Sequence, residues 1–418
     1  MNIAIIGAGI IGVTTAYELA ADGHAVTVFE RHTSLAEEAS FANAGVISTS
    51  WATPWQAPSM ASRLGQTALA RPAMVRMVRP WNAADLGWMR RWSAARQPTT
   101  YTANRARLQR LALYSRHQLQ ELSERLTYTF DRKEGYLVLL RSEKDHHLAQ
   151  PGMEALRELG VPFHAISAAE ARQIEPALHP HTPLAGALHF PQDEVANCRQ
   201  FAVIVRDAAE QFGARFLFNT PVAGIDKTQP ATLHLENGAG TQRFDAIVLC
   251  AGAQSASLLA SLGIGLPLRP VYGYSISAHI PEPINAPRSG VMDEHYKVAI
   301  TRLGQRVRVS GMAEIGGGPS HLEDRAMRTL YKVLADWFPA AARLSMGVQI
   351  WKGARPMLPD GPPVIGASGI PGLWLNLGHG ASGWTLACGS ARVLADQISG
   401  QAPQIDMEGL GLERLFGR

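Results

Sequence analysis

The sequence contains few cysteines, only three among 418 residues. Cys198, Cys250 and Cys388 lie far apart, form no Cys-x-x-Cys motif and are odd in number. A disulfide framework is therefore excluded, and a reducing compartment is indicated. The histidines lack ligand spacing with cysteine or carboxylate residues, so we predict no metal site.

Long apolar runs are scarce as well. The opening MNIAIIGAG has no basic segment and no cleavage site, so we expect no secretory signal. One uncharged run, residues 246–268, is long enough to span a bilayer. Glycine, serine, glutamine and proline interrupt this run, which favours a strand, a glycine turn and a helix over a membrane span. We therefore expect a cytoplasmic protein.

Lysine and acidic residues are nearly absent from one segment. Residues 51–116 contain eleven arginines, no lysine and one acidic residue, Asp85, together with five of the nine tryptophans. Arginine beside interfacial tryptophan suits peripheral contact with an anionic membrane surface. A solvated helical face with tryptophans in the core is the slightly favoured explanation of the pattern. No recognition module accompanies the charge, so nucleic-acid binding is not expected.

The remaining composition is typical of a globular protein, with 46% hydrophobic and 18% charged residues. A chain of 418 residues exceeds what one hydrophobic core usually serves. We therefore expect two domains.

The first thirty residues predict a dinucleotide-binding unit. An apolar strand over residues 3–6 leads into a Gly-x-Gly-x-x-Gly turn and a helix that ends near Gly23. A second strand, residues 25–29, leads to Glu30. The turn therefore stands in the context that a dinucleotide fingerprint requires.

Each glycine of this turn, and the acidic residue that follows, has a physical role. Gly7 makes the tight turn, Gly9 lets the backbone approach a pyrophosphate, and Gly12 lets helix and strand pack closely. The pyrophosphate would lie at the positive end of the helix dipole. Glu30 is placed to accept hydrogen bonds from ribose hydroxyls.

Several later segments favour FAD over NAD as the dinucleotide. EEASFANAGVIS (residues 37–48) is a small-residue loop, FDAIVLCAGAQS is a strand that runs into Gly252, and FLFNTPVAGID is predicted to be another strand. NLGHGASGWT (residues 376–385) precedes a predicted helix whose N-terminus could supply donors to a flavin ring. The predicted FAD-binding residues are Gly7, Ala8, Gly9, Ile10, Ile11, Gly12, Glu30, Arg31, Ser40, Asn43, Ala44, Gly45, Val46, Val222, Ala251, Gly252, Gly378, Gly380, Ser382, Gly383, Trp384 and Thr385.

Together these segments resemble the D-amino-acid oxidase superfamily of flavoenzymes, and within it most closely the bacterial D-amino-acid dehydrogenases. The shared patterns include GAGIIGVTTAYELA, SFANAGVIS, RPVYGYSIS, MDEHYKVAITR, VSGMAEIGG, ARPMLPDGPPVIG and LNLGHGASGWTLACGS. They occur in one order over nearly the whole chain. Tyr272 departs from the pattern, because the family often has lysine there, and this affects the expected substrate preference more than the reaction type.

The resemblance implies an α/β protein with a discontinuous Rossmann-like FAD-binding domain and an α+β substrate domain built on an antiparallel sheet. We expect the FAD-binding domain to comprise residues 1–60, 190–265 and 345–418, and the substrate domain residues 61–189 and 266–344. YKVAITRLGQRVRVSG alternates as a hairpin should. SHLEDRAMRTLYKVLADWF predicts a helix that opens with a Ser320–Glu323 capping box.

The family chemistry is oxidation of an amino acid at Cα, with hydride transfer to flavin N5 and hydrolysis of the imino acid to a 2-oxo acid and ammonia. Arg355 matches the carboxylate-binding arginine of the family, and a guanidinium suits a carboxylate. Tyr272 and Tyr274 resemble pocket tyrosines, although core packing explains them nearly as well. His379 could contact the substrate or the ring, or serve a structural role. Weaker candidates are Tyr296, Lys297 and Arg302.

Three functions are consistent with these residues. The first is a D-amino-acid dehydrogenase of amino-acid catabolism that passes electrons to a quinone or the respiratory chain. The second is an oxidase of the same fold acting on glycine, sarcosine or a cyclic imino acid such as D-proline or hydroxyproline. The third is a flavin-binding protein without turnover, against which Arg355 and the tyrosines argue.

Overall fold

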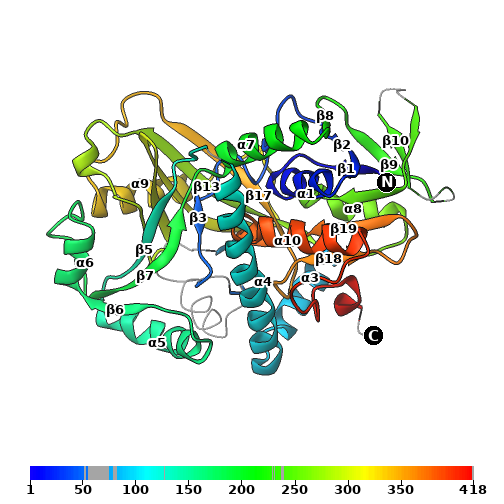
Figure 1. Ribbon diagram of the computed structural model, residues 1–418. Coiled ribbons are helices and arrows are strands. Elements are labelled where there is room, and N and C mark those ends of the chain that lie inside the picture. Colours follow the sequence, from blue (N-terminus) through cyan, green and yellow to red (C-terminus); the bar gives the residue numbers. More distant parts are fainter. Residues whose placement is uncertain are drawn as a thin grey trace.

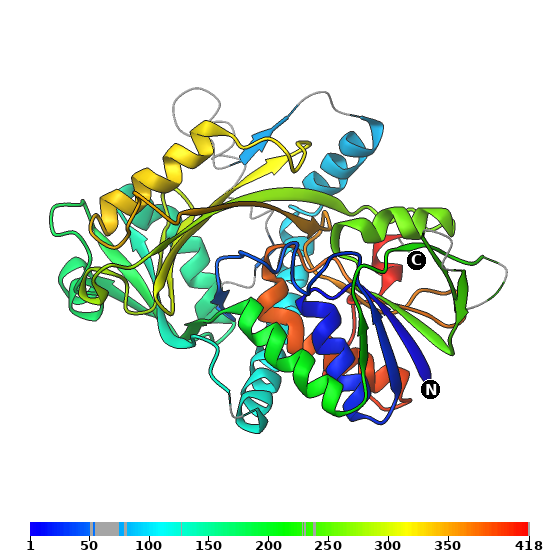
Figure 2. The same ribbon diagram turned by 90° about the horizontal axis from the view of Figure 1, so that it is seen from above.

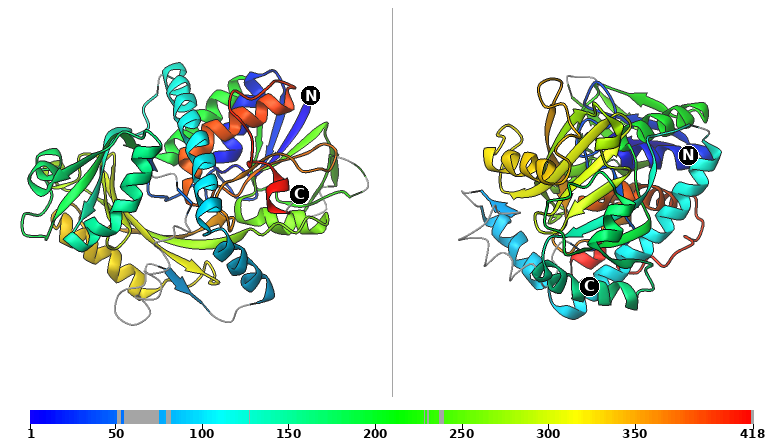
Figure 3. Two further views of the ribbon diagram at one scale, coloured as in Figure 1. Left: turned by 90° about the horizontal axis from the view of Figure 1, so that it is seen from below. Right: turned by 90° about the vertical axis from the view of Figure 1, so that its left-hand side faces the viewer.

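The computed structural model describes residues 1–50, 53–54, 75–78, 82–126, 128–227, 229, 231–236 and 240–416. Two large sheets organise this part of the chain, and the long helix α4 (Pro98–Arg125) runs between them (Figures 1 and 3). Trp51, Trp55 and Trp81 lie outside the described residues.

The smaller sheet has six strands in the order β18-β19-β12-β1-β2-β8. All neighbouring pairs are parallel except β18 with β19. The strands are β1 (Asn2–Ile6), β2 (Ala25–Phe29), β8 (Arg215–Leu217), β12 (Ala246–Leu249), β18 (Val364–Ala367) and β19 (Leu373–Leu377). Ile3 is fully buried in the core on one face, and Ala4 and Ile247 are fully buried in the core on the other, as expected for a parallel sheet covered on both faces.

Helices cover one face of this sheet and a small sheet covers the other. Figure 2 shows α7, α1 and α10 side by side on the first face; they are α1 (Ile10–Ala21), α7 (Cys198–Gln211) and α10 (Gly383–Ile398). The second face carries α8 (Ser255–Ser261) and the strands β9 (Val222–Ile225), β10 (Thr232–Leu235) and β11 (Thr241–Arg243). Apolar side chains from both layers form the core of this half of the molecule.

The larger sheet has ten strands, in the order β17-β13-β16-β15-β14-β5-β7-β3, with β4 beside β16 and β6 beside β7. They are β3 (Val46–Ile47), β4 (Val75–Met77), β5 (Lys133–Leu140), β6 (His164–Ser167), β7 (Gly186–Val195), β13 (Arg269–His279), β14 (Gly290–Asp293), β15 (Val298–Leu303), β16 (Arg306–Ile315) and β17 (Gln349–Met357). The other α-helices of the described residues are α3 (Ala83–Ala94), α5 (Glu143–Glu158), α6 (Ala168–Ile174) and α9 (Asp324–Trp337). Leu330 and Trp337 of α9 are fully buried against this sheet.

Most of the local predictions are confirmed. The strand, helix and strand expected in residues 3–29 are β1, α1 and β2, and the hairpin is formed by β15 and β16. The uncharged run of residues 246–268 forms β12, a short turn of 3-10 helix and α8. No helix in the described ranges is both long and apolar enough to cross a bilayer.

Two local predictions are wrong. The capping box is not formed, because α9 begins at Asp324 with Glu323 as its N-cap, and no side chain caps it. The strand expected in FLFNTPVAGID is split into β8 and β9, which belong to different sheets. Asn219 between them has a φ of 52°, a left-handed conformation that reverses the chain.

The domain boundaries at residues 190 and 345 do not coincide with the edges of the sheets. Strand β7 crosses residue 190 and β17 follows residue 345, yet both belong to the ten-stranded sheet. The division of the chain into domains therefore stays a prediction.

Candidate active site

One cavity of about 1090 Å³ runs from the start of α1 to the larger sheet. Pockets for a single small ligand are usually about 300–1,000 Å³, so this cavity exceeds the usual size of a pocket for one such ligand. All of the predicted FAD-binding residues except Ala8 and Gly12 line it. The structure thus brings together segments that are up to 378 residues apart, from Gly7 to Thr385.

The glycines of the first turn serve two purposes. A Cβ on Gly7 would lie 2.7 Å from the Cys250 carbonyl oxygen, and one on Gly12 would lie 1.9 Å from the Gly7 carbonyl oxygen. These two glycines are required by packing within the protein. A Cβ on Gly9 would meet nothing closer than Ser40 Oγ, at 3.5 Å. The space at Gly9 is therefore kept open on the side of the cavity.

The start of α1 is suited to an anion. Gly9 is its N-cap and provides no side-chain cap. The amides of the first turn and the helix dipole therefore point toward the cavity, which is the arrangement that binds a pyrophosphate. Within the described structure, the Ile10 amide of this first turn donates to a side chain, Ser40 Oγ, at 3.1 Å.

Glu30 joins the two ends of the first β-α-β unit. Its Oε2 accepts a hydrogen bond from the Ala8 amide at 2.8 Å, and its Oε1 accepts one from the His32 amide at 2.8 Å. A carboxylate has about four lone-pair sites, so Glu30 can still accept from ribose hydroxyls at the cavity wall. Arg31 also lines the cavity and forms an ion pair with Glu38.

The loop of residues 40–48 is tied down at several points. Asn43 Oδ1 accepts from the Gly45 amide at 2.9 Å, and Thr385 Oγ1 accepts from the Ser48 amide at 3.2 Å. Gly45 has a φ of 73°, and a Cβ there would lie 3.0 Å from the Ala196 carbonyl oxygen. These contacts fix the loop beside the start of α10.

Asp193 supports the same loop and was not predicted from the sequence. It is 1% exposed, and Oδ2 accepts from Ser48 Oγ at 2.5 Å. Its Oδ1 accepts from the Thr49 amide at 3.1 Å and from Ser50 Oγ at 3.1 Å. Burial raises the pKa of Asp193, and these donors oppose that rise. Asp193 thereby positions Ser48 and Ser50, which line the cavity.

A second helix start opens onto the cavity at the end of β19. Gly378 and Gly380 have φ values of 80° and 55°, and a Cβ on Gly380 would lie 2.7 Å from Met357 Sδ. The helix α10 begins at Gly383, with Ser382 as an N-cap that forms no side-chain cap. Its free amides can therefore face a ligand, as expected for donors to a flavin ring.

His379 has a structural position in this loop. Ser390 Oγ donates its one hydrogen to the Leu386 carbonyl oxygen at 2.7 Å. It therefore accepts the hydrogen bond that joins it to His379 Nε2 at 2.9 Å, which places a proton on Nε2. His379 is 4% exposed, and burial lowers its pKa to about 3. The imidazole is therefore neutral throughout the neutral pH range, and it is a poor candidate for a proton-transferring group.

His379 makes a testable contribution to stability. Because its pKa is about 3 in the folded chain and near 6.5 when unfolded, acid favours the unfolded chain through this group. The stabilisation is complete above pH 6.5 and is lost progressively as the pH falls toward 3. We expect urea unfolding of the His379→Gln variant to depend less steeply on pH between 6.5 and 4 than that of the native protein. Equal slopes would contradict a buried neutral imidazole.

Arg355 lies at the other end of the cavity, on β17. Its Nη1 donates to the Met312 carbonyl oxygen at 2.9 Å, and its guanidinium lies over Gly273, where a Cβ would come within 2.3 Å of Nη2. Arg355 forms no ion pair within the described ranges, and the residues outside those ranges include no Asp or Glu. Burial lowers the pKa of Arg355 to about 10. A guanidinium so placed can bind a carboxylate ligand.

Tyr272 and Tyr274 share one face of β13, but it is not the face of Arg355. Their register partners on β17 are Ala354 and Lys352, whereas Arg355 pairs with Val271. Successive residues of a strand point to opposite faces. Lys352 Nζ lies 4.9 and 5.2 Å from the two ring centroids. Tyr274 reaches the cavity wall, and Tyr272 is not among its lining residues in the described structure.

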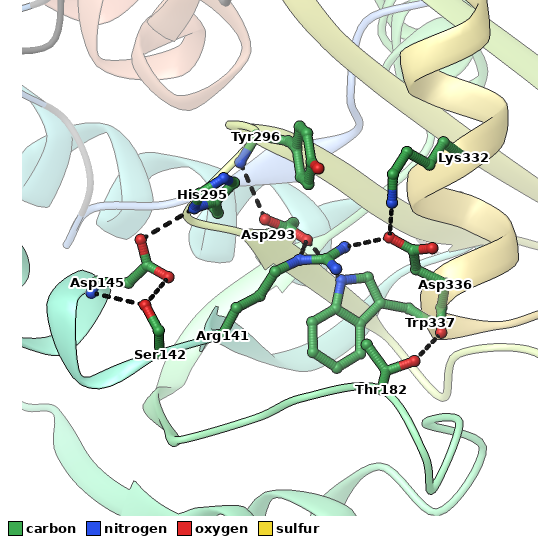
Figure 4. Close-up of polar contacts among 10 residues, drawn as sticks. All are labelled: Arg141, Ser142, Asp145, Thr182, Asp293, His295, Tyr296, Lys332, Asp336 and Trp337. Carbon is green, nitrogen blue, oxygen red and sulfur yellow. Dashed lines mark hydrogen bonds and ion pairs between the residues drawn. The ribbon is translucent and has the colours of Figure 1, made fainter. Parts of the chain in front are cut away.

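The turn between β14 and β15 carries the weaker candidates. Lys297 lines the cavity and forms an ion pair with Glu294. Behind the turn, buried Asp293 accepts from Arg141 Nε at 2.6 Å, from Trp337 Nε1 at 2.7 Å and from the Tyr296 amide at 3.0 Å (Figure 4). The Arg141 guanidinium lies over the Tyr296 ring, with Arg141 Cζ 5.0 Å from the centroid of that ring. These contacts hold the turn between β14 and β15, whose Lys297 lines the cavity, in a fixed position.

Arg302 lies away from the cavity. Its guanidinium donates to the carbonyl oxygens of Gly304 and Pro283, each at 3.3 Å. It therefore fastens the hairpin of β15 and β16 to a neighbouring loop.

Comparisons with known proteins agree with this geometry. The D-amino acid dehydrogenase of Cereibacter sphaeroides is 42% identical over 417 residues, which are 99% of this chain and 95% of that protein. The D-amino acid dehydrogenase of Bradyrhizobium diazoefficiens is 41% identical over 422 residues and covers 100% of both chains. The similarity therefore extends over at least 95% of each relative.

Solved structures show the same fold. Glycine oxidase from Geobacillus kaustophilus has a TM-score of 0.76 at 23% identity and covers 98% of both chains. Iminodiacetate oxidase from a Chelativorans species has a TM-score of 0.73 at 22% identity and covers 98% of both chains. The predicted fold class, with a Rossmann-like FAD domain, is confirmed.

The family follows from a match over nearly the whole chain. The family model described as FAD dependent oxidoreductase, DAO, matches residues 2–397. This range includes both helix starts and Arg355. The chain therefore belongs to the DAO family of FAD-dependent oxidoreductases, and its cofactor is FAD.

Proposed function

We propose that the protein oxidises D-amino acids to 2-oxo acids and ammonia, with electrons passed to an acceptor other than oxygen. The observation that carries this proposal is the position of Arg355, a partly buried cation without a carboxylate partner in the described chain, in the cavity that holds the FAD-binding turns. Full-length identity of 41–42% with proteins named D-amino acid dehydrogenase supports the stereochemistry and the acceptor class.

The residues of the chain divide the work between binding and exclusion of water. Bound FAD supplies the hydride acceptor. Arg355 holds the substrate carboxylate through two parallel hydrogen bonds and so fixes the direction of the Cα–H bond. The amine loses its proton to solvent before reaction, because His379 is engaged with Ser390 and titrates too low to act as a base.

We propose that the acceptor is a quinone or another member of a respiratory chain, reached by peripheral contact at the inner face of the cell membrane. On α3, Leu86 is 55% exposed and Arg90 is also exposed, which suits such contact. Trp88 and Trp92 of the same helix are buried, so these two belong to the core rather than to an interfacial belt.

We also propose that the two sheets mark the two domains. Under this division the FAD-binding domain is built on the six-stranded sheet and the substrate domain on the ten-stranded sheet. The boundaries then lie after β7 and after β17 rather than at residues 190 and 345. Arg355 belongs to the substrate domain and faces the FAD-binding turns across the shared cavity.

The proposal is tested by steady-state turnover with enantiomer pairs, glycine, sarcosine and D-proline, using an electron-accepting dye. We expect 2-oxo acid and ammonia in equal amounts from D-amino acids, with little product from the L-enantiomers. Peroxide formation without dye at a rate equal to the dye-coupled rate would identify an oxidase. Turnover confined to glycine, sarcosine or D-proline would overturn the substrate class.

A further inference from the structure

A second buried arginine lines the same cavity. Arg105 lies in the second turn of α4, is 6% exposed and contributes to the cavity wall. Its Nε is buried without a hydrogen-bond partner, and no ion pair engages its guanidinium in the described ranges. The residues outside those ranges include no Asp or Glu, so they cannot supply a side-chain carboxylate either.

Neighbouring arginines of the same helix behave differently. Arg107 forms an ion pair with Glu408, with Nε 3.1 Å from Oε2, and Arg110 lies 3.4 Å from a carboxylate oxygen of Asp406. Arg116 donates to Gln192 at 2.8 Å. Arg105 is thus the arginine that α4 presents to the cavity, and the described residues provide no hydrogen-bond acceptor for its Nε.

The surroundings of Arg105 suit a ligand carboxylate. Tyr101, one turn earlier on α4, lines the cavity beside it and can add a hydroxyl donor. The helix α5 contributes apolar Leu148, Ala149 and Pro151 to the wall of the same cavity. Burial lowers the pKa of Arg105, and the charges of Tyr101 and of exposed Glu158 oppose this only in part. An unpaired buried cation is costly unless an anion joins it.

Arg105 and Arg355 are linked through a short stretch of chain. Asn104 Nδ2 donates to the Asp360 carbonyl oxygen at 3.0 Å. Asp360 follows Arg355 by five residues, which can span at most about 18 Å when extended. Both arginines line the one cavity. The cavity thus offers two guanidinium groups to the ligands that it holds.

We propose that Arg105, assisted by Tyr101, binds the side-chain carboxylate of dicarboxylic D-amino acids, while Arg355 binds the α-carboxylate. Arg105 is then a specificity-determining residue that favours acidic over neutral substrates. This inference rests on the proposed function, because it assigns a substrate class to the same site.

The test compares D-glutamate with its amide, D-glutamine, which has the same shape without the charge. In the Arg105→Met variant, the ratio of kcat/KM for D-glutamate to that for D-glutamine falls by about 10- to 100-fold, the loss expected for charge-assisted hydrogen bonds. Turnover of D-alanine and D-glutamine stays within about twofold, since neither needs the guanidinium. Arg105→Lys retains part of the preference. Arg125→Met, in the exposed last turn of α4, leaves the ratio unchanged.

Two further measurements separate this role from a structural one. Removal of an unpaired buried cation leaves the Tm of Arg105→Met unchanged or raises it, whereas loss of a structural arginine lowers it. Binding of glutarate, a dicarboxylate that cannot be oxidised at an amine, is followed by its effect on the flavin absorbance. Glutarate binding weakens about 10- to 100-fold in Arg105→Met, while butyrate binding does not change.

The outcomes are distinct. An unchanged acid-to-amide ratio, or an equal loss for all substrates together with a lower Tm, overturns the role of Arg105. If the native protein oxidises no D-amino acid, the proposed function fails, and glutarate binding alone then decides on Arg105. Glutarate that binds equally well to the native protein and to Arg105→Met overturns the inference in that case too.

Discussion

Replacing Arg355 with methionine lowers kcat/KM for every amino-acid substrate by roughly 100- to 1,000-fold, as expected when one partner of a buried charge pair is removed. FAD stays bound, because Arg355 lies on β17 rather than at the dinucleotide turns. The measurement is steady-state turnover at saturating dye, with the flavin absorbance as a check on occupancy.

The matched control is Arg343→Met, which removes an exposed arginine from the substrate half of the chain. This variant should keep native kcat/KM. D-alaninamide, which lacks the carboxylate, should be a poor substrate for the native protein and no worse for Arg355→Met. If Arg355→Met discriminated against the amide as strongly as the native protein does, the carboxylate would have to bind elsewhere.

Gly9→Ala yields a folded protein that binds FAD roughly 10- to 100-fold more weakly, the effect of forcing one methyl group into a filled contact. Gly9 has a φ of −70°, so alanine causes no backbone strain there. Its Cβ would be 3.5 Å from the nearest protein atom, so the protein itself accommodates it. The penalty therefore falls on the pyrophosphate.

The affinity is measured by titrating stripped protein with FAD and following the quenching of flavin fluorescence. Gly224→Ala, where a Cβ meets nothing within 4 Å, serves as the control and should bind FAD normally. Gly12→Ala should reduce the yield of folded protein, since its Cβ would overlap a carbonyl oxygen at 1.9 Å. Native FAD affinity in folded Gly9→Ala would place the pyrophosphate away from the start of α1.

The FAD-binding turns could be predicted because their determinants are local. A strand, a glycine turn, a helix and Glu30 occur within thirty residues, and each is set by nearby sequence. Ala8 and Gly12 are the two predicted residues that lie behind the cavity wall. Ala8 donates to Glu30 and Gly12 packs against Gly7, so both shape the turn without lining the cavity.

The substrate end could be predicted only in part, because it depends on which face of a strand meets the cavity. Alternation placed Tyr272 and Tyr274 together but did not decide whether Arg355 shares their face. Arg105 and Asp193 gave no local signal either. Their roles arise from the packing of α4 and β7 against loops more than one hundred residues away, as the Asn104–Asp360 and Asp193–Ser48 contacts show.

The most direct test of the proposed reaction is an anaerobic titration of the flavin with D-alanine, followed by admission of air to the same cuvette. We expect D-alanine to bleach the flavin band with one equivalent of pyruvate per FAD, L-alanine to leave it unchanged, and the colour to return slowly in air and rapidly with a quinone. A flavin that no D-amino acid bleaches would contradict the proposed reaction. Rapid recovery in air with stoichiometric peroxide would contradict the dehydrogenase assignment.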